Sequence, residues 1–135
     1  MKTQGILETA LYVADLDISE RFYRDLFGFE TLLADERMRA LRISETQILL
    51  LFVLGGSTSG EKTPGGKIPP HDGHGQLHLA FRIEKFALEE WRQRLKSQNI
   101  EIESEVSAND GHSLYFRDPD GHCLELGTLG LWNTA

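Results

Sequence analysis

Three residues of types that bind divalent metal ions stand in short segments with the pattern of β-strands. Glu8, His78 and Glu125 each alternate with apolar residues of their segment. Because successive side chains of a strand point to opposite faces, all three are expected on the face away from the core. Carboxylate oxygens and a neutral imidazole nitrogen are ordinary ligands of a divalent cation. The pattern indicates a metal site, and it also allows solvated surface carboxylates beside a hydrogen-bonded histidine.

The same alternation places other polar side chains on this face. Arg82 shares it with His78 in the segment 77–83, and Tyr115 and Arg117 share it in the segment 113–117. The apolar residues between them are expected to pack beneath helices. The face opposite the core is therefore predicted to be polar and ionisable.

The elements that position these residues repeat along the chain. The first half has a strand pattern at 6–13, a helix pattern at 18–27, and extended segments at 29–33, 38–43 and 47–54. The second half has the same order, with a strand at 77–83, a helix at 86–98, and strands at 101–106, 113–117 and 123–127. A repeat of this kind indicates a duplicated module. We predict an α+β fold of two tandem βαβββ modules that form a curved mixed sheet around a central cleft.

Residues at the ends of the two helices have the chemistry of caps. Asp17 is the predicted N-cap of the first helix, and Glu20 stands three residues later, as in a capping box. Gly28 and Asn99 are expected to end the two helices in the left-handed conformation.

A segment rich in glycine, proline and small polar residues separates the halves. Residues 55–76 read GGSTSGEKTPGGKIPPHDGHGQ, which predicts a long connection without internal structure. His71 and His74 within it are expected to be solvent-exposed. We predict one domain over residues 1–135, with module 1 at about 1–54, the connection at 55–76 and module 2 at about 77–135.

Composition and charge exclude several classes of partner. The 135 residues include 14 Lys and Arg against 21 Asp and Glu, a formal net charge of −7, and no basic run that would bind nucleic acid. The longest apolar run, at 48–54, is too short to span a membrane. The first residues do not have the pattern of a signal peptide, and the single cysteine, Cys123, is typical of a reducing compartment. We therefore expect a cytoplasmic protein.

Two longer motifs resemble those of a known family. The segment ETALYVADLDISERFYRDLFGFE resembles the first module of the vicinal oxygen chelate superfamily, and SLYFRDPDGHCLEL resembles the closing hairpin of its second module. The superfamily includes glyoxalase I, fosfomycin-thiol transferases, extradiol dioxygenases and bleomycin-resistance proteins. The resemblance implies paired βαβββ modules around a metal site, commonly in a homodimer.

The resemblance also implies a ligand set. The first-strand ligands of the two modules fall on Glu8 and His78, and the last-strand carboxylate after the DPDGH turn falls on Glu125. The position that matches Glu125 in the first module falls near Leu50, which cannot bind a metal ion. A set of two glutamates and one histidine implies a divalent ion such as Mn²⁺, Mg²⁺, Ni²⁺, Fe²⁺ or Zn²⁺.

With three protein ligands, an octahedral ion keeps positions for water and for a substrate that binds through two oxygens. The implied chemistry is stabilisation of an oxyanion as it forms. We expect Tyr115 to act as a hydrogen-bond donor or acid, and Arg82 or Arg117 to hold an anionic group of the substrate.

Two functions from different classes follow. The first is a metal-dependent lyase, thiol transferase or dioxygenase that acts on a small oxygen-rich or electrophilic molecule. The alternative is a metal-free protein that sequesters a drug or metabolite, with Phe52 and Trp132 as aromatic walls. A binding protein has no need for ionisable residues at all three ligand positions, which favours the enzyme.

Overall fold

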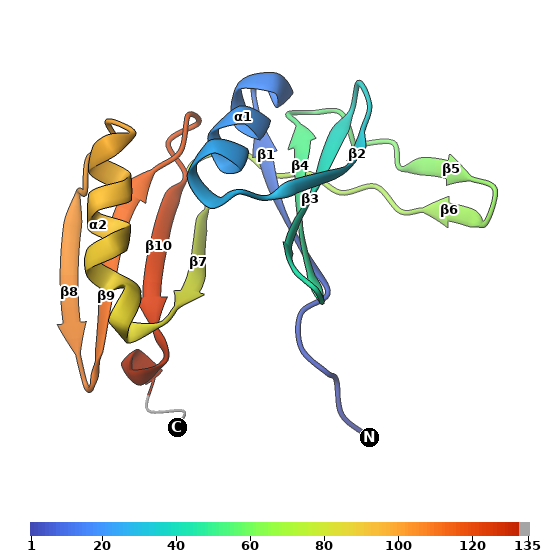
Figure 1. Cartoon of the computed structure of the whole chain (residues 1–135). Helices are drawn as coiled ribbons and strands as arrows, with labels where there is room; N and C mark the ends of the chain where they lie inside the picture. The colour runs from blue at the N-terminus through green and yellow to red at the C-terminus, as the bar shows by residue number, and fades with distance from the viewer. Residues whose placement is uncertain (133–135) are drawn as a thin grey trace. The chain divides into compact units, whose positions relative to one another are not determined.

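The computed structural model describes residues 1–132, which divide into two compact units. Unit 1 covers Met1–Gly75, and unit 2 begins at Gln76. Each unit combines one α-helix with a four-stranded mixed sheet (Figure 1). The connection predicted over residues 55–76 belongs almost entirely to unit 1.

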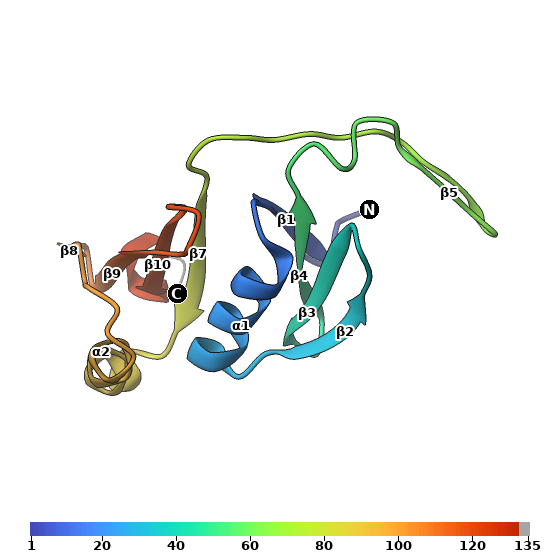
Figure 2. The ribbon, with the colours of Figure 1, turned by 90° about the horizontal axis from the view of Figure 1, so that it is seen from above.

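Unit 1 has the predicted βαβββ order. Its elements are β1 (Glu8–Val13), α1 (Leu16–Phe27), β2 (Glu30–Ala34), β3 (Met38–Ser44) and β4 (Gln47–Val53). The strands lie in the order β1-β4-β3-β2, with β1 parallel to β4 and the other pairs antiparallel. Helix α1 covers one face of this sheet (Figure 2), where alternate strand residues and one helix face form a core of fully buried side chains that includes Val13, Leu26, Leu41, Leu49 and Leu51.

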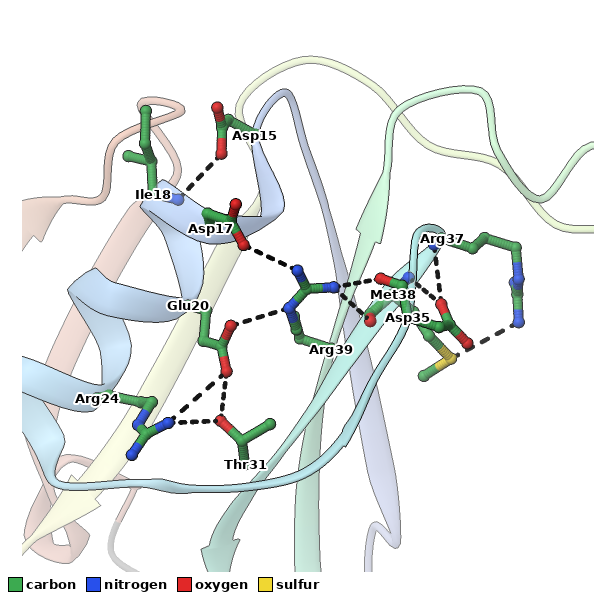
Figure 3. A network of polar contacts seen from close by, with 10 residues as sticks. All are labelled: Asp15, Asp17, Ile18, Glu20, Arg24, Thr31, Asp35, Arg37, Met38 and Arg39. Carbon is green, nitrogen blue, oxygen red and sulfur yellow. Dashed lines mark hydrogen bonds and ion pairs between the residues drawn. The ribbon is translucent and has the colours of Figure 1, made fainter.

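Helix α1 begins two residues before the predicted start. Its N-cap is Asp15, whose side chain accepts a hydrogen bond from the Ile18 backbone N–H at 3.0 Å, so the expectation of Asp17 as N-cap was wrong. Glu20 does not complete a capping box. Its carboxylate instead accepts a hydrogen bond from Arg39 of β3 at 2.8 Å, which ties the helix to the sheet (Figure 3). Gly28 ends the helix with φ of 74°, as predicted.

The connection contains a β-hairpin that the sequence pattern did not predict. Strands β5 (Glu61–Thr63) and β6 (Gly66–Ile68) pair antiparallel, and the Thr63 hydroxyl donates a hydrogen bond to the Gly66 carbonyl at 2.6 Å. Each strand has three residues without apolar alternation, so backbone pairing forms the hairpin and periodicity cannot reveal it. The prediction of a connection without internal structure was wrong.

Unit 2 repeats the topology of unit 1. Its elements are β7 (His78–Ile83), the 3₁₀ turn η1 (Lys85–Ala87), α2 (Leu88–Ser97), β8 (Ser104–Ala108), β9 (Gly111–Arg117), β10 (Cys123–Thr128) and η2 (Leu129–Trp132). The strand order is β7-β10-β9-β8, with β7 parallel to β10. Asn99, two residues after the end of α2, has φ of 58°, as predicted. The predicted strand at 101–106 begins three residues later, at Ser104.

The two units therefore confirm the predicted α+β class and the two tandem βαβββ modules. Their sheets match strand by strand, because β7, β10, β9 and β8 correspond to β1, β4, β3 and β2. No helix within residues 1–132 is both long and apolar enough to cross a membrane.

Candidate functional site

Unit 2 brings together two of the three predicted metal ligands. His78 opens β7 and Glu125 lies in the neighbouring strand β10, with the imidazole Nε2 3.3 Å from the carboxylate Oε1. The His78 Nδ1 lies 2.8 Å from the backbone carbonyl of Cys123. Because a carbonyl only accepts hydrogen bonds, Nδ1 carries a proton, and in the neutral ring Nε2 keeps its lone pair for a metal ion.

The carboxylate of Glu125 is buried, with 11% of its side chain exposed, and its second oxygen is occupied by the protein. The Ser113 hydroxyl donates a hydrogen bond to Oε2 at 2.5 Å. Tyr115 lies directly opposite Glu125 in the β9–β10 pair. Burial, followed by the negative charge of Glu125, raises the pKa of the Tyr115 phenol, so Tyr115 remains a hydrogen-bond donor at neutral pH.

Strand register explains why these side chains share a face. In the β7–β10 pair, His78 lies opposite Cys123 and Ala80 opposite Glu125, and in the β9–β10 pair Ser113 lies opposite Gly127. Residues two apart on each strand point the same way, so the polar face collects the ligand pair and its neighbours. The opposite face carries the buried apolar residues Phe81, Leu114, Phe116, Leu124 and Leu126.

The turn between β9 and β10 holds the start of β7 in place. Asp118 accepts hydrogen bonds from the backbone N–H groups of Asp120 and His122 at 3.0 and 2.9 Å, which confirms the DPDGH turn. The buried His122 accepts a hydrogen bond from the Leu77 backbone N–H through Nδ1 at 2.9 Å. The residue before His78 is thus fixed by the turn that leads to Glu125.

Glu8, the third predicted ligand, is the first residue of β1 in unit 1 and lies opposite Ile48. It lines a cleft of about 770 Å³. Within residues 1–132, no group of three or more His, Cys, Asp or Glu side chains is placed to hold a metal ion. The structure brings together His78 and Glu125, and the complete three-residue set stays a prediction.

The register identifies the residue of unit 1 that matches Glu125. Leu50 of β4 lies opposite Ala10 of β1, two residues after Glu8, just as Glu125 lies opposite Ala80, two residues after His78. The module comparison therefore places an apolar side chain where unit 2 has its carboxylate.

The cleft of unit 1 is mostly apolar and has a polar pair on one side. The phenol oxygen of Tyr12, in β1, lies 2.7 Å from the Nδ1 of His71, in the connection. The His71 ring also packs edge-on against Phe52, with ring centroids 4.6 Å apart. His71 is therefore partly buried and lines the cleft, so the expectation of a solvent-exposed side chain was wrong for this residue.

The positive charge in the cleft is already paired. Arg37 is the sole Lys or Arg among the described residues that line it. Its guanidinium forms an ion pair with Glu61 and donates a hydrogen bond to the Ser57 hydroxyl at 2.9 Å. Burial, followed by the charge of Asp72, raises the pKa of the Tyr12 phenol, which therefore stays neutral at physiological pH.

The two arginines predicted to hold a substrate anion differ in their surroundings. Arg117, at the end of β9, donates hydrogen bonds to Glu103 at 3.0 Å and to the Gly121 carbonyl at 3.1 Å. It thereby braces the β9–β10 turn. Arg82 is exposed on β7, on the same face as His78. This arrangement favours Arg82 for contact with a substrate.

Sequence reasoning missed Ser113, although the signal was present. Ser113 alternates with Leu114 in the segment that also contains Tyr115, which places it on the ligand face. The contact between His71 and Tyr12 had no such signal, because it depends on the path of the connection.

Comparisons with known proteins agree with this architecture. The family model described as the Glyoxalase/Bleomycin resistance protein/Dioxygenase superfamily matches residues 5–126, and the chain belongs to this superfamily. The chain is 33% identical over 131 residues to the metallothiol transferase FosB of Staphylococcus saprophyticus, covering 93% of this chain and 77% of that protein. It is 28% identical over 134 residues to the fosfomycin resistance protein FosX of Listeria monocytogenes, covering 93% and 91%.

A solved structure gives a further match over the full length. The crystal structure of lactoylglutathione lyase from Agrobacterium tumefaciens has a TM-score of 0.88 and 35% sequence identity, and covers 98% of this chain and 99% of that chain. These relatives confirm the predicted superfamily and the prediction of an enzyme of the vicinal oxygen chelate type. They favour the enzyme over the metal-free binding protein.

Proposed function

We propose that the protein is a metal-dependent transferase that adds a thiol to a small electrophilic molecule carrying neighbouring oxygen atoms. One observation carries the proposal: the His78 Nε2 and the Glu125 Oε1 lie 3.3 Å apart, while the other polar atom of each side chain is hydrogen-bonded within the protein. Two donors that are oriented in this way, with Glu8 as the third ligand, suit a divalent ion such as Mn²⁺, Mg²⁺, Ni²⁺, Fe²⁺ or Zn²⁺.

A divalent ion at these ligands would polarise a substrate oxygen and stabilise the negative charge that develops on it. For an epoxide, the thiol sulfur forms a bond to the ring carbon, the carbon–oxygen bond breaks, and the thiol proton passes to the released oxygen. Tyr115 stays protonated beside Glu125, and its hydroxyl would donate a hydrogen bond to a substrate oxygen on this face. Arg82 supplies a positive charge on the same strand as His78.

The apolar cleft of unit 1 supports a substrate with an apolar body. Its wall includes Met38, Ala40 and Phe52, which are buried, together with Ile48 and Leu50. Arg37 is already paired with Glu61, so this cleft offers no free cation to an anionic substrate group. We expect this cleft to bind molecules with aliphatic or aromatic groups more tightly than compact anions such as fosfomycin.

The apolar side chain of Leu50, which cannot act as a base, favours thiol transfer over the lyase reaction. Isomerisation of a hemithioacetal requires a base that removes a proton from one carbon and returns it to the next, and a carboxylate at the position of Leu50 would be suited to this role. Addition of a thiol to an epoxide does not need that second carboxylate. The lyase reaction is the second candidate because of the match to lactoylglutathione lyase over nearly the whole chain.

One experiment separates the two reactions. Protein loaded with Mn²⁺ is incubated with glutathione or L-cysteine and, in turn, with phenyl glycidyl ether, which carries two neighbouring oxygen atoms, with fosfomycin or with methylglyoxal. The proposal predicts an adduct in mass spectrometry with the summed mass of thiol and epoxide. A thioester formed from methylglyoxal and glutathione, without epoxide adducts, would assign the lyase reaction instead.

We expect the active protein to be a homodimer in the cytoplasm, with a small molecule as its substrate. The support is membership of the superfamily, for which the sequence resemblance implies a homodimer. Sedimentation equilibrium tests the dimer, and a monomer at micromolar concentration would contradict it.

A further inference from the structure

The two oxygens of the Glu125 carboxylate have different partners. Oε2 accepts the hydrogen bond of the buried Ser113 hydroxyl at 2.5 Å, and Oε1 lies 3.3 Å from the His78 Nε2. A carboxylate held through one oxygen cannot rotate freely about its last side-chain bond. The oxygen beside the histidine is therefore the one that remains available.

The space around Oε2 depends on a residue without a side chain. Gly127 lies directly opposite Ser113 in the β9–β10 pair. A Cβ atom at residue 127 would lie 2.9 Å from the Glu125 Oε2 and 3.0 Å from the Leu131 Cδ1. Both contacts are closer than carbon atoms normally approach, so any larger residue would displace the carboxylate or the leucine.

Unit 1 shows what stands at these positions when the carboxylate is absent. Leu50 matches Glu125, and the register of β3 and β4 places Met38 and Phe52 where unit 2 has Ser113 and Gly127. The module without the carboxylate thus also lacks the hydroxyl and the open space. The serine and glycine accompany the carboxylate as one arrangement.

We propose that Ser113 and Gly127 are positioning residues for metal binding, which hold Glu125 so that Oε1 stays beside the His78 Nε2. This inference rests on the proposed function, because it assumes that Glu125 binds a metal ion. Groups that orient a metal ligand through hydrogen bonds contribute about 10–100-fold to metal affinity. Loss of the Ser113 hydroxyl would also leave a buried carboxylate oxygen without its donor.

The test is a calorimetric titration of Mn²⁺ into the metal-free protein, which measures the affinity for the ion. The Ser113→Ala variant is expected to bind Mn²⁺ about 10-fold or more weakly than the wild type. Ser113→Thr keeps the hydroxyl and is expected to recover most of the affinity. The matched control is Ser107→Ala, which removes the hydrogen bond between Ser107 and His112 of 2.8 Å in the same unit. It should bind Mn²⁺ as the wild type does.

A second pair of variants tests the open space beside Gly127. Gly127→Ala is expected to weaken Mn²⁺ binding by a similar factor, whereas Gly65→Ala, whose added Cβ would approach nothing closer than 3.9 Å, is the control. Circular dichroism and urea unfolding show whether each variant is folded. Wild-type Mn²⁺ affinity in folded Ser113→Ala and Gly127→Ala would overturn the inference and leave the proposed function intact. A wild type that binds neither Mn²⁺, Ni²⁺ nor Zn²⁺ would overturn both.

Discussion

Leu50 and Glu125 hold equivalent places in the two modules, each opposite an alanine that follows the first-strand ligand position by two residues. Duplication has kept the backbone and changed the chemistry. Unit 2 presents a buried carboxylate with a serine and a glycine that accommodate it, and unit 1 presents an apolar wall. The second module thus carries the pair of candidate metal ligands, whereas the first carries an apolar cleft.

The contact between Tyr12 and His71 is expected to fasten the connection to the sheet of unit 1. Gly73 also lies against the Tyr12 ring, where an added Cβ would come within 2.4 Å. Tyr12→Phe removes the hydrogen bond and should lower the free energy of unfolding by about 0.5–1.5 kcal/mol. It should also speed amide hydrogen exchange around residues 71–73.

His71→Ala should have a similar effect, and the double variant should be less destabilised than the sum of the two single variants. His74→Ala, which changes an exposed histidine of the same segment, is the control and should leave stability unchanged. Strict additivity of Tyr12→Phe and His71→Ala would contradict the fastening role.

The carboxyl group of Glu105, on β8, makes the stability of the protein depend on pH. Hydrogen bonds from Arg92 and then His112 lower the pKa of the Glu105 carboxyl from its ordinary value of 4.5. A lowered pKa in the folded state contributes stability above the ordinary pKa, and this contribution is lost as the pH falls through the folded value. Because 36% of the side chain is exposed, solvent screening limits the contribution to about 1 kcal/mol or less.

Glu105→Gln should therefore be less stable than the wild type at pH 7, and the difference should shrink as the pH falls below 4.5 and through the lowered pKa of the folded state. Urea unfolding at a series of pH values measures this. The control is Glu101→Gln, an exposed glutamate in the segment before β8. A difference between Glu105→Gln and wild type that persists unchanged at low pH would refute the role of the carboxylate charge.

The two arginines of unit 2 should respond differently to substitution. Arg117→Ala removes the hydrogen bonds to Glu103 and to the Gly121 carbonyl and is expected to lower stability by up to about 1 kcal/mol. Arg82→Ala changes an exposed side chain and should leave stability within about 0.5 kcal/mol of the wild type. Thermal unfolding measures the stability of both variants. Equal stabilities of Arg117→Ala and Arg82→Ala would argue against the bracing role of Arg117.

Much of this architecture is readable from the sequence, because strand alternation and module order are local patterns. Period-two alternation correctly placed His78 and Glu125 on one face, since register carries that pattern directly into space. The N-cap of α1 was misplaced because Asp15 and Asp17 are both good caps. The Asp17 carboxylate instead accepts a hydrogen bond from the Arg39 guanidinium at 2.9 Å. That choice depends on a strand more than twenty residues away.

Other features required the fold itself. The β5–β6 hairpin has no apolar periodicity, and the partner of His71 lies 59 residues earlier in the chain. Ser113 was within reach of the alternation argument, but its role depends on the diagonal contact with Glu125 and on the space above Gly127. Sequence patterns identify the face on which a residue lies, whereas its hydrogen-bond partner follows from packing.

The central claim is that His78 and Glu125 bind a divalent metal ion, and the most direct test is the Mn²⁺ content of the protein. Elemental analysis after reconstitution and desalting compares the wild type with His78→Ala and Glu125→Gln, and Arg82→Ala serves as the control on the same face. The account predicts about one ion per chain in the wild type and the control, and loss of the ion in both ligand variants. Equal metal content in all four proteins would contradict it.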